Sequence, residues 1–578
     1  MLPPQRGSGH ARRGWPSVAL ALAFALGCNG SIEGPADGIP ESFGPGGTDP
    51  STTLDGQSPE EVLNSPECKT PAPGAAPMRR LSNAEYRNTV ADLLGGIPGM
   101  DAKVAELSSA FPGEAESLGF RNAAHMLTVP QLVAQKYMDA AEGIAEFLLP
   151  QLSSLLPCTT QDKACATDFI VDFGKRAFRR PLSVEEVQRY EALYDKALVE
   201  YDFNTGIEWI VFSILQATPF LHRMEFGATA AGAVTKPSGY EMASRLSYLI
   251  WQSMPDAELF SAAENGQLET PAQIEGQARR LLDDPKAERM LEFYDQWLDI
   301  DTLSTSMDRD SAVYPDLPDT LPTLFREESR AFVSSLINSP TGSLTELFTA
   351  PYTYVNSELA QHYGLPIPSG SGFEKVDAPG RSGILTQGMM LAHDRPIRTS
   401  IVRRGLKIRT DVLCQLVPAP PPDVEFNLEA LGENLTQRER LALHRADRAC
   451  AGCHNLMDPI GEAFEWFDAV GRPRTADEQG IPIVVAPKLS STLDADGDVA
   501  NPVELGDRLA QSAEVRDCYV TETFRFFYGR DSETGDKCSM AKLVLSFRDS
   551  EYNLRELIVA LTQTDAFLYR PVVTPEAP

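Results

Sequence analysis

The sequence predicts a mainly α-helical, multi-domain protein. Its 578 residues are enough for about three to five domains of roughly 100 to 150 residues each. Apolar residues recur at helical spacing along most of the chain, for example over residues 207–221 and 321–337. Two capping boxes, Ser82 with Glu85 and Ser183 with Glu186, mark the starts of helices. We therefore expect a helical body that ends in a C-terminal helical bundle.

The first 28 residues predict export. Arg6, Arg12 and Arg13 precede an apolar run at residues 18–26, which is too short to span a bilayer and is typical of a signal peptide. The run ends in Ala25-Leu26-Gly27-Cys28, which resembles the cleavage box of bacterial lipoproteins. Cys28 is then the lipid-bearing first residue of a protein of the cell envelope, in the outer membrane or on the periplasmic face. Ordinary signal-peptidase cleavage nearby is the alternative.

Composition and periodicity divide the rest of the chain. Residues 29–77 are rich in Gly, Pro, Ser, Asp and Thr and poor in large apolar residues, so they predict a disordered tether. After the signal peptide at 1–28 and this tether we expect a helical domain at 78–150, a helical hairpin domain at 151–203, a central helical domain at 204–365, a motif-bearing domain at 378–475, a linker at 476–503 and a C-terminal helical domain at 504–570.

The charge balance argues against one class of partner. Asp and Glu outnumber Lys and Arg by 81 to 51, which gives a formal net charge of −30. Such a surplus repels phosphate backbones, so we expect no nucleic acid partner.

One short motif carries most of the chemical information. Cys450-Ala451-Gly452-Cys453-His454 has the spacing of a c-type haem attachment sequence. On a helix, Cys450 and Cys453 lie one turn apart, where each thiol can form a thioether with a haem vinyl group, and His454 can serve as the proximal iron ligand. The motif predicts one covalent haem c, which makes residues 378–475 a cytochrome-like segment.

Other readings of the motif stay open. Two cysteines at this spacing also occur as a redox dithiol, as a structural disulfide, and as half of a zinc site. A zinc site needs a second Cys or His pair at finger spacing, and none follows. The alternative function is a non-catalytic helical surface scaffold or binding protein in which Cys450 and Cys453 form a disulfide.

The distal haem ligand is not assigned by the sequence. Met457 follows His454 by three residues on the same helical face, whereas a distal ligand approaches from the opposite side of the ring. The remaining candidates are single side chains spread along the chain: Met389, Met390, His393, His444 and Met540.

Cysteine counting fits an oxidising compartment. Setting aside Cys28 and the two motif cysteines leaves six of the nine cysteines, enough for three disulfides. Cys158 and Cys165 are close enough in sequence to form one bridge, and Cys518 and Cys538 another. Cys68 and Cys414 would then form the third.

Several segments together resemble one group of proteins. The segments are residues 79–94, 176–182, 243–248 with 255–256, 381–386, 450–461 and 524–530. They are similar to successive modules of the secreted cytochrome-like multidomain proteins of planctomycetes and myxobacteria, which are built from a series of domains of unknown function. The resemblance implies export and a cytochrome-like character, but no substrate.

The chemistry expected from the sequence is redox chemistry. No Ser-His-Asp spacing, nucleotide loop or paired-His metal motif indicates a hydrolase. The motif fits an electron carrier with a redox partner in the cell envelope and equally a haem-dependent enzyme, so enzymatic activity is left undecided.

Overall fold

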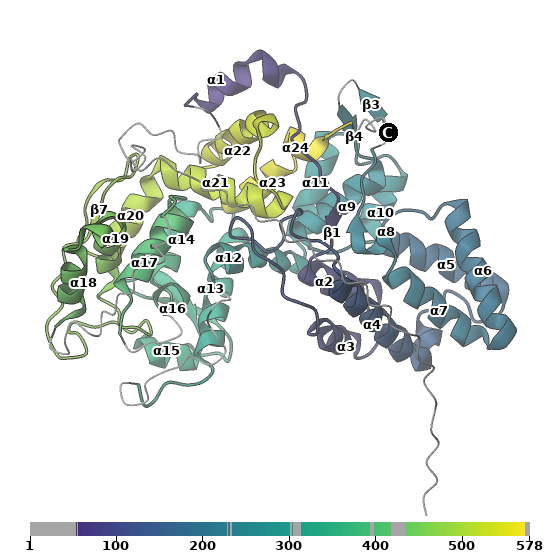
Figure 1. Cartoon of the computed structure of the whole chain (residues 1–578), viewed down its shortest axis with the longest axis horizontal. Coiled ribbons are helices and arrows are strands. Elements are labelled where there is room, and N and C mark those ends of the chain that lie inside the picture. The colour runs from purple at the N-terminus through teal and green to yellow at the C-terminus, as the bar shows by residue number, and fades with distance from the viewer. Residues whose placement is uncertain are drawn as a thin grey trace, which may run out of the picture. The chain divides into compact units, whose positions relative to one another are not determined.

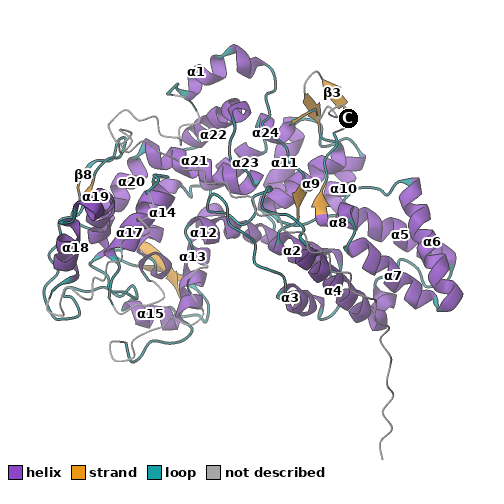
Figure 2. Cartoon of the chain, viewed as in Figure 1, coloured by secondary structure: helices purple, strands orange, loops and turns teal. Residues whose placement is uncertain are grey.

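Helices make up most of the chain that the computed structural model describes, namely residues 54, 56–227, 229–231, 234–300, 303, 314–392, 398–417 and 435–572 (Figure 2). The mainly α prediction is confirmed. The predicted signal peptide with Cys28, most of the first half of the tether, and His393 lie outside these residues. Within them, no helix has the length and apolar character needed to cross a bilayer.

The N-terminal helices begin where the sequence provides caps. Ser82 accepts a hydrogen bond from the backbone of Glu85, and Glu85 accepts one from the backbone of Ser82. Their apolar faces form one core that includes the rings of Tyr86, Tyr137 and Phe220. The helices are α2 (Asn83–Leu93), α3 (Met100–Ser108), α4 (Gln131–Leu148), α5 (Lys163–Phe178), α6 (Val184–Glu200), α7 (Phe203–Leu215) and α8 (Thr218–Leu221), with 3-10 turns at Pro66–Lys69 and Leu149–Ser154.

The middle of the chain contributes a second and larger core. Phe293 stacks on Trp297 at 5.6 Å between ring centroids, and Trp251 is buried in the same core. These aromatic residues are therefore core residues. The helices are α9 (Gly239–Ile250), α10 (Ala257–Glu264), α11 (Pro271–Leu282), α12 (Glu292–Trp297), α13 (Leu321–Ile337), α14 (Leu344–Thr349) and α15 (Ser357–Tyr363), with a 3-10 helix at Pro285–Leu291.

The motif-bearing segment and the C-terminal segment share this second core. The motif-bearing segment contains α16 (Gly388–Leu391), α17 (Ile401–Lys407), a π-helix (Ile408–Val412), α18 (Gln437–Arg445), α19 (Arg448–Gly461) and 3-10 turns at Gly383–Thr386 and Glu462–Phe464. The C-terminal segment contains α20 (Pro502–Gln511), α21 (Ala513–Tyr528), α22 (Lys537–Asp549), α23 (Leu554–Leu561) and α24 (Asp565–Leu568), with a 3-10 turn at Thr534–Asp536.

The strands that the structure describes are short and antiparallel. Arg80 pairs with His222, which joins the start of the folded chain to the end of its first helical region. Strand β4 (Val234–Lys236) lies between β3 (Thr229–Ala231) and β9 (Arg570–Pro571) and pairs with both, while the other pairs are β1 (Arg79–Arg80) with β2 (His222–Arg223), β5 (Tyr352–Val355) with β6 (Glu374–Asp377), and β7 (Lys488–Leu489) with β8 (Gly497–Asp498). The last pair lies inside the segment predicted as a linker.

The predicted tether is wrong in its second half. Ser58 caps α1 (Pro59–Asn64), whose Val62 is buried, and α1 packs against α22. Gln57 accepts a hydrogen bond from Lys537, and Cys68 is bonded to Cys538. The composition of this segment suggests disorder, but a covalent bond and one buried valine hold it in place.

The disulfide prediction is correct for one bond and wrong for two. Cys158 is bonded to Cys165, as predicted from their short spacing. Cys518 is bonded to Cys414 rather than to Cys538, and Cys538 is bonded to Cys68. Closeness in sequence therefore fails as a guide for cysteines that lie on neighbouring rigid helices and face different segments.

Candidate functional site

The helix that carries the Cys-x-x-Cys-His motif crosses another helix at backbone contact. A Cβ atom on Gly405 of α17 would lie closer than 3.0 Å to the carbonyl oxygen of Met457 on α19, and one on Gly461 of α19 equally close to the carbonyl oxygen of Ile401. Side chains do not tolerate such distances, so both positions require glycine. The crossing fixes the C-terminal half of α19 against α17 (Figure 1).

A buried arginine ties α17 to the chain that follows α19. The guanidinium of Arg404 donates hydrogen bonds to the carbonyl oxygens of Leu391, Phe464, Phe467 and Asp468, at 2.6 to 3.2 Å. Burial lowers the pKa of Arg404 to about 10, still well above neutral pH. Glu465, which is also buried, lies 3.7 Å from the guanidinium, so backbone carbonyls and one carboxylate together compensate the charge and this arginine joins α17 to the turn after α19.

Helix α18 and a short turn bring a second histidine to the motif. Thr436 and Glu439 form the capping box that starts α18, and His444 lies in its last turn. The amide of Cys450 donates to the carbonyl oxygen of Asp447, which starts α19 immediately after the turn. Helices α18 and α19 pack against each other, so the end of α18 lies beside the start of α19.

Both motif thiols are free. Cys450 and Cys453 are half-buried and are not bonded to each other. Burial, followed by the negative charge of Asp447, raises the pKa of the Cys450 thiol, so it stays protonated at neutral pH. The structure therefore does not contain the disulfide of the alternative, and two free cysteines one turn apart are the groups that thioether formation requires.

A buried carboxylate orients the motif histidine. The Nδ1 atom of His454 lies 3.0 Å from Oδ1 of Asp458, which is fully buried, and Arg445 lies 3.6 Å from the other carboxylate oxygen. Because an ionised carboxylate only accepts hydrogen bonds, Nδ1 of His454 is the donor. The lone pair then lies on Nε2, the nitrogen with which a proximal histidine binds the iron. Metal-binding histidines commonly donate their other ring N–H to a carboxylate in this way.

The lone pair on Nε2 faces the second histidine. Nε2 of His444 lies 3.0 Å from Nε2 of His454, and the two ring planes are nearly perpendicular, at 89°. Burial and the neighbouring His454 lower the pKa of His444, which keeps it neutral. With Nε2 of His454 as the acceptor, Nε2–H of His444 is the donor.

The residues present fit a haem on chemical grounds. The helix offers two free thiols at the attachment spacing and an imidazole whose tautomer is set by Asp458. The zinc alternative finds no support, because among the described residues the motif cysteines and histidine are not part of any close group of three metal-binding side chains. The residues that fit a haem are thus the two attachment cysteines, Cys450 and Cys453, and the proximal ligand, His454.

The other distal candidates are less suited. The backbone carbonyl of Met457 packs against Gly405, and Met540 is buried in α22 within the C-terminal segment. Met389 and Met390 line a pocket of about 210 Å³ beside α17, together with Arg403, Lys407 and Asp411. Only His444 contacts His454 among the candidates that the structure describes.

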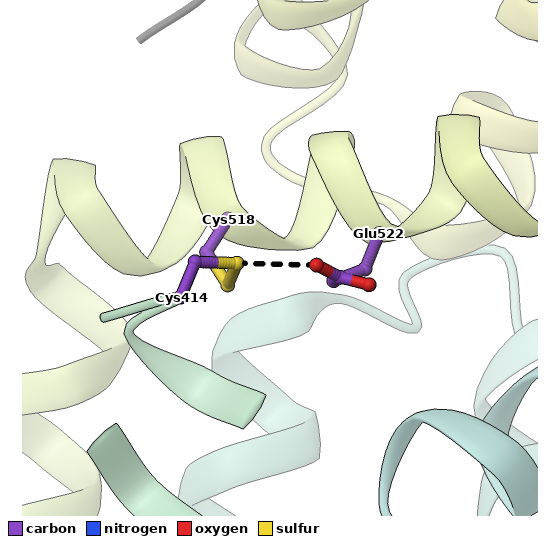
Figure 3. Close-up of side chains that lie close together, drawn as sticks. All are labelled: Cys414, Cys518 and Glu522. Carbon is purple, nitrogen blue, oxygen red and sulfur yellow. Dashed lines mark hydrogen bonds between the residues drawn. A yellow bond between two sulfur atoms is a disulfide. The ribbon is translucent and has the colours of Figure 1, made fainter. Parts of the chain in front are cut away.

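Cys414, Cys518 and Glu522 form a close group of side chains of the kinds that bind metal ions. Cys414, which follows the π-helix, is bonded to Cys518 on α21, and Oε1 of Glu522 lies 3.4 Å from the Cys414 sulfur (Figure 3). Burial raises the pKa of Glu522 to about 7 in spite of a 2.6 Å contact with Arg525. Since the sulfurs are bonded to each other, the group joins two segments covalently and offers no thiolate to a metal.

Comparison with known families identifies five domains in series. The matches are Protein of unknown function (DUF1587) over residues 79–149, Protein of unknown function (DUF1595) over 165–225, Protein of unknown function (DUF1592) over 238–365, Protein of unknown function (DUF1588) over 381–477 and Protein of unknown function (DUF1585) over 496–567. The fourth family carries the short name PSCyt3, which points to a cytochrome-like character, and its match contains the motif. No curated protein and no solved structure matches the chain.

Sequence reasoning found the motif but missed its support. Asp458 follows His454 by four residues, a spacing that puts both on one helical face, and this could have been read from the sequence. The requirement for glycine at 405 and 461 could not, because it depends on which helix crosses α19.

Proposed function

We propose that this protein, which is built from five domains of unknown function in series, is a cytochrome-like protein of the cell envelope that holds one covalent haem c. Cys450 and Cys453 form the thioether bonds, and His454 is the proximal iron ligand. The bound haem supplies a one-electron redox centre for electron transfer or for haem-dependent redox chemistry. Export, a lipid anchor on Cys28 and a redox partner in the envelope are parts of this proposal.

The observation that supports it most is the state of the motif helix. Two free thiols and an imidazole held by a buried carboxylate lie within two turns of one helix, inside the segment that matches PSCyt3. The buried Asp458 also fixes which nitrogen of His454 carries the proton, a function that bracing by the two cysteines alone would not need.

The chain's own residues have separate tasks. The free cysteines Cys450 and Cys453 supply the sulfur atoms, and the half-exposed face of α19 leaves them accessible. Asp458 holds the proton on Nδ1 of His454 and so keeps the Nε2 lone pair available. The crossing of α17 and α19 keeps this helix in place, so the sulfur atoms and the imidazole stay in register.

Covalent haem is tested directly. The full chain is expressed in a host with the haem-attachment machinery, and the product is run on a denaturing gel stained for haem peroxidase activity and examined as a pyridine haemochrome. A thioether-linked haem stays with the polypeptide after boiling. We expect one haem per chain, with complete loss in Cys450→Ala with Cys453→Ala.

A matched pair of cysteines provides the control. Cys158→Ala with Cys165→Ala also removes two cysteines but leaves the motif intact, so it should keep the haem. A colourless, stain-negative product, from a host that matures a control cytochrome, would contradict the proposal. In that case the helical scaffold with a Cys450–Cys453 disulfide becomes the better account, and peptide mapping under non-reducing conditions would detect the bond.

The lipid anchor is tested separately. Metabolic labelling with a fatty acid should mark the wild type and not Cys28→Ala. Absence of label from both proteins would refute the anchor without affecting the haem proposal.

A further inference from the structure

We infer that the disulfide between Cys414 and Cys518 is a site of thiol–disulfide exchange, at which a dithiol attacks the sulfur of Cys414 and Glu522 supplies the proton that Cys518 takes up. The site lies outside the motif helix, and the inference does not depend on a bound haem. The substrate class is a dithiol, the kind of molecule that reduces protein disulfides through a mixed-disulfide intermediate.

A carboxyl group beside the sulfurs sets this disulfide apart from the other two. In each of the three bonds one cysteine is half-buried and the other is buried, so exposure alone does not distinguish them. Glu522 places a carboxylate oxygen within 4.8 Å of both sulfurs of this bond, and 3.4 Å from the Cys414 sulfur (Figure 3). Among the described residues, no other disulfide belongs to such a close group with a carboxylate.

The burial of the two cysteines decides which sulfur a thiolate can reach. Cys414 follows the π-helix and is half-buried, whereas Cys518 lies on α21 and is 1 % exposed. In thiol–disulfide exchange the thiolate bonds to one sulfur while the other sulfur leaves. Attack on the more accessible Cys414 therefore makes Cys518 the leaving group.

The leaving sulfur needs a proton. A thiolate on Cys518 would be a buried charge, which is unfavourable unless it is neutralised. Glu522 follows Cys518 by four residues, so both side chains lie on one face of α21. The carbonyl oxygen of Asp411 lies 3.6 Å from the Cys518 sulfur, where it can accept a hydrogen bond from the thiol that forms.

Glu522 can hold that proton near neutral pH. Burial raises the pKa of its carboxyl group to about 7, and the nearby Asp411 and Asp531 act in the same direction, while Arg525 opposes them. Arg525 donates a 2.6 Å hydrogen bond to Oε1, so the carboxylate that remains after proton transfer is already paired. A pKa close to the working pH suits general acid–base catalysis.

The exchange balances in atoms and electrons. The first thiolate of the dithiol bonds to the Cys414 sulfur, the Cys414–Cys518 bond breaks, and Cys518 takes the proton of Glu522. The second thiolate then displaces Cys414 and closes the disulfide of the oxidised dithiol. Two electrons pass from the dithiol to the protein. The two protons that the dithiol loses enter the solvent, which returns one proton to Glu522 and one to Cys414.

The test measures the reduction of the folded full chain by dithiothreitol. Samples are quenched with acid at intervals, free thiols are alkylated, and each cysteine pair is followed by peptide mass spectrometry. We expect the Cys414–Cys518 bond to open without denaturant, and Glu522→Gln to slow this step by about 10²-fold. Glu522→Asp, which keeps a carboxyl group, should give a rate between those of the wild type and Glu522→Gln.

The other two disulfides are internal controls. The bonds Cys158–Cys165 and Cys68–Cys538 should be reduced at the same rates in the wild type and in Glu522→Gln, because Glu522 does not belong to a close group with their sulfurs. A second measurement needs no variant. Glutathione, which has one thiol, should be trapped as a mixed disulfide on Cys414 and not on Cys518, so the order of the sulfurs is tested even if Glu522→Gln fails to fold.

Three results would overturn the inference. Reduction of the Cys414–Cys518 bond only in denaturant would show that the folded protein does not exchange it. Equal rates in the wild type and in a folded Glu522→Gln would exclude Glu522 as the proton donor. Glutathione trapped on Cys518 would reverse the order of attack. None of these results bears on haem attachment, so the proposed function is tested separately.

Discussion

The two halves of the motif helix differ sharply. In the first half of α19, Cys450 and Cys453 are half-buried and Gly452 is exposed. In the second half, Asp458 and Ile460 are fully buried and Gly461 lies against the backbone of α17. One short helix can therefore be both accessible and rigid: the cysteines stay accessible because the other half of the same helix makes the packing contacts.

Removal of the disulfide between Cys414 and Cys518 should have a large effect on stability. Cys414 follows the π-helix that extends α17, and its bond to Cys518 spans a sequence separation of 104. Loops of this size predict a loss of about 4.7 kcal/mol when the bond is removed. Chemical unfolding of Cys414→Ser with Cys518→Ser should show this loss.

The short disulfide is the comparison for that experiment. Cys158 and Cys165 are separated by only 7 positions, so Cys158→Ser with Cys165→Ser should cost roughly half as much. Equal losses in the two double variants would mean that loop closure does not govern the stability of this chain.

The glycine contact is the next target. In Gly461→Ala the new methyl group overlaps the backbone of Ile401, which cannot rotate away as a side chain can, so α17 and α19 must separate. We expect a loss of about 3 kcal/mol in the free energy of unfolding. Thermal unfolding followed by circular dichroism measures this loss. An unchanged midpoint would show that α17 and α19 are not in backbone contact at Gly461.

The buried carboxylate links the two halves. Asp458→Asn keeps the size of the side chain but removes the negative charge between His454 and Arg445. The expected loss is about 2 kcal/mol, since hydrogen bonds to charged groups are worth more than neutral ones. Unfolding by denaturant measures the loss, with Asn455→Ala on the exposed side of the same helix as a control that should change little.

The smallest effect should have the opposite sign. A Cβ atom on Gly452 meets nothing within 4 Å, and this glycine lies inside the helix. Gly452→Ala should therefore stabilise the protein by about 0.5 to 1 kcal/mol, because alanine loses less conformational freedom on folding. Glycine to alanine should thus raise the free energy of unfolding at position 452 and lower it at position 461. A decrease at both positions would contradict the difference between the two halves of α19.

Local features of the fold could be predicted from the sequence. The capping boxes at Ser82 and Ser183 start α2 and α6, because a cap depends only on residues three positions apart. The C-terminal helices were likewise predicted from apolar spacing. Such signals are complete within one or two helical turns, so no knowledge of the tertiary structure is needed.

Features that depend on distant partners could not be predicted. Cys518 lies on α21 and Cys538 near the start of α22, and each bonds to a cysteine more than 100 positions away. The sequence offered His444 as one of five distal candidates, but its contact with His454 depends on the packing of α18 on α19. The helical order of residues 59–64 also depends on α22, which composition does not reveal.

The bond between Cys68 and Cys538 has a mechanical consequence. It spans a sequence separation of 470, so the chain between these residues is a closed covalent ring with two arms. Tension applied to the arm before residue 68 and the arm after residue 538 passes through the sulfur atoms and never loads the ring. A protease cut anywhere in the ring would leave both pieces on one molecule until the sulfur bridges are reduced.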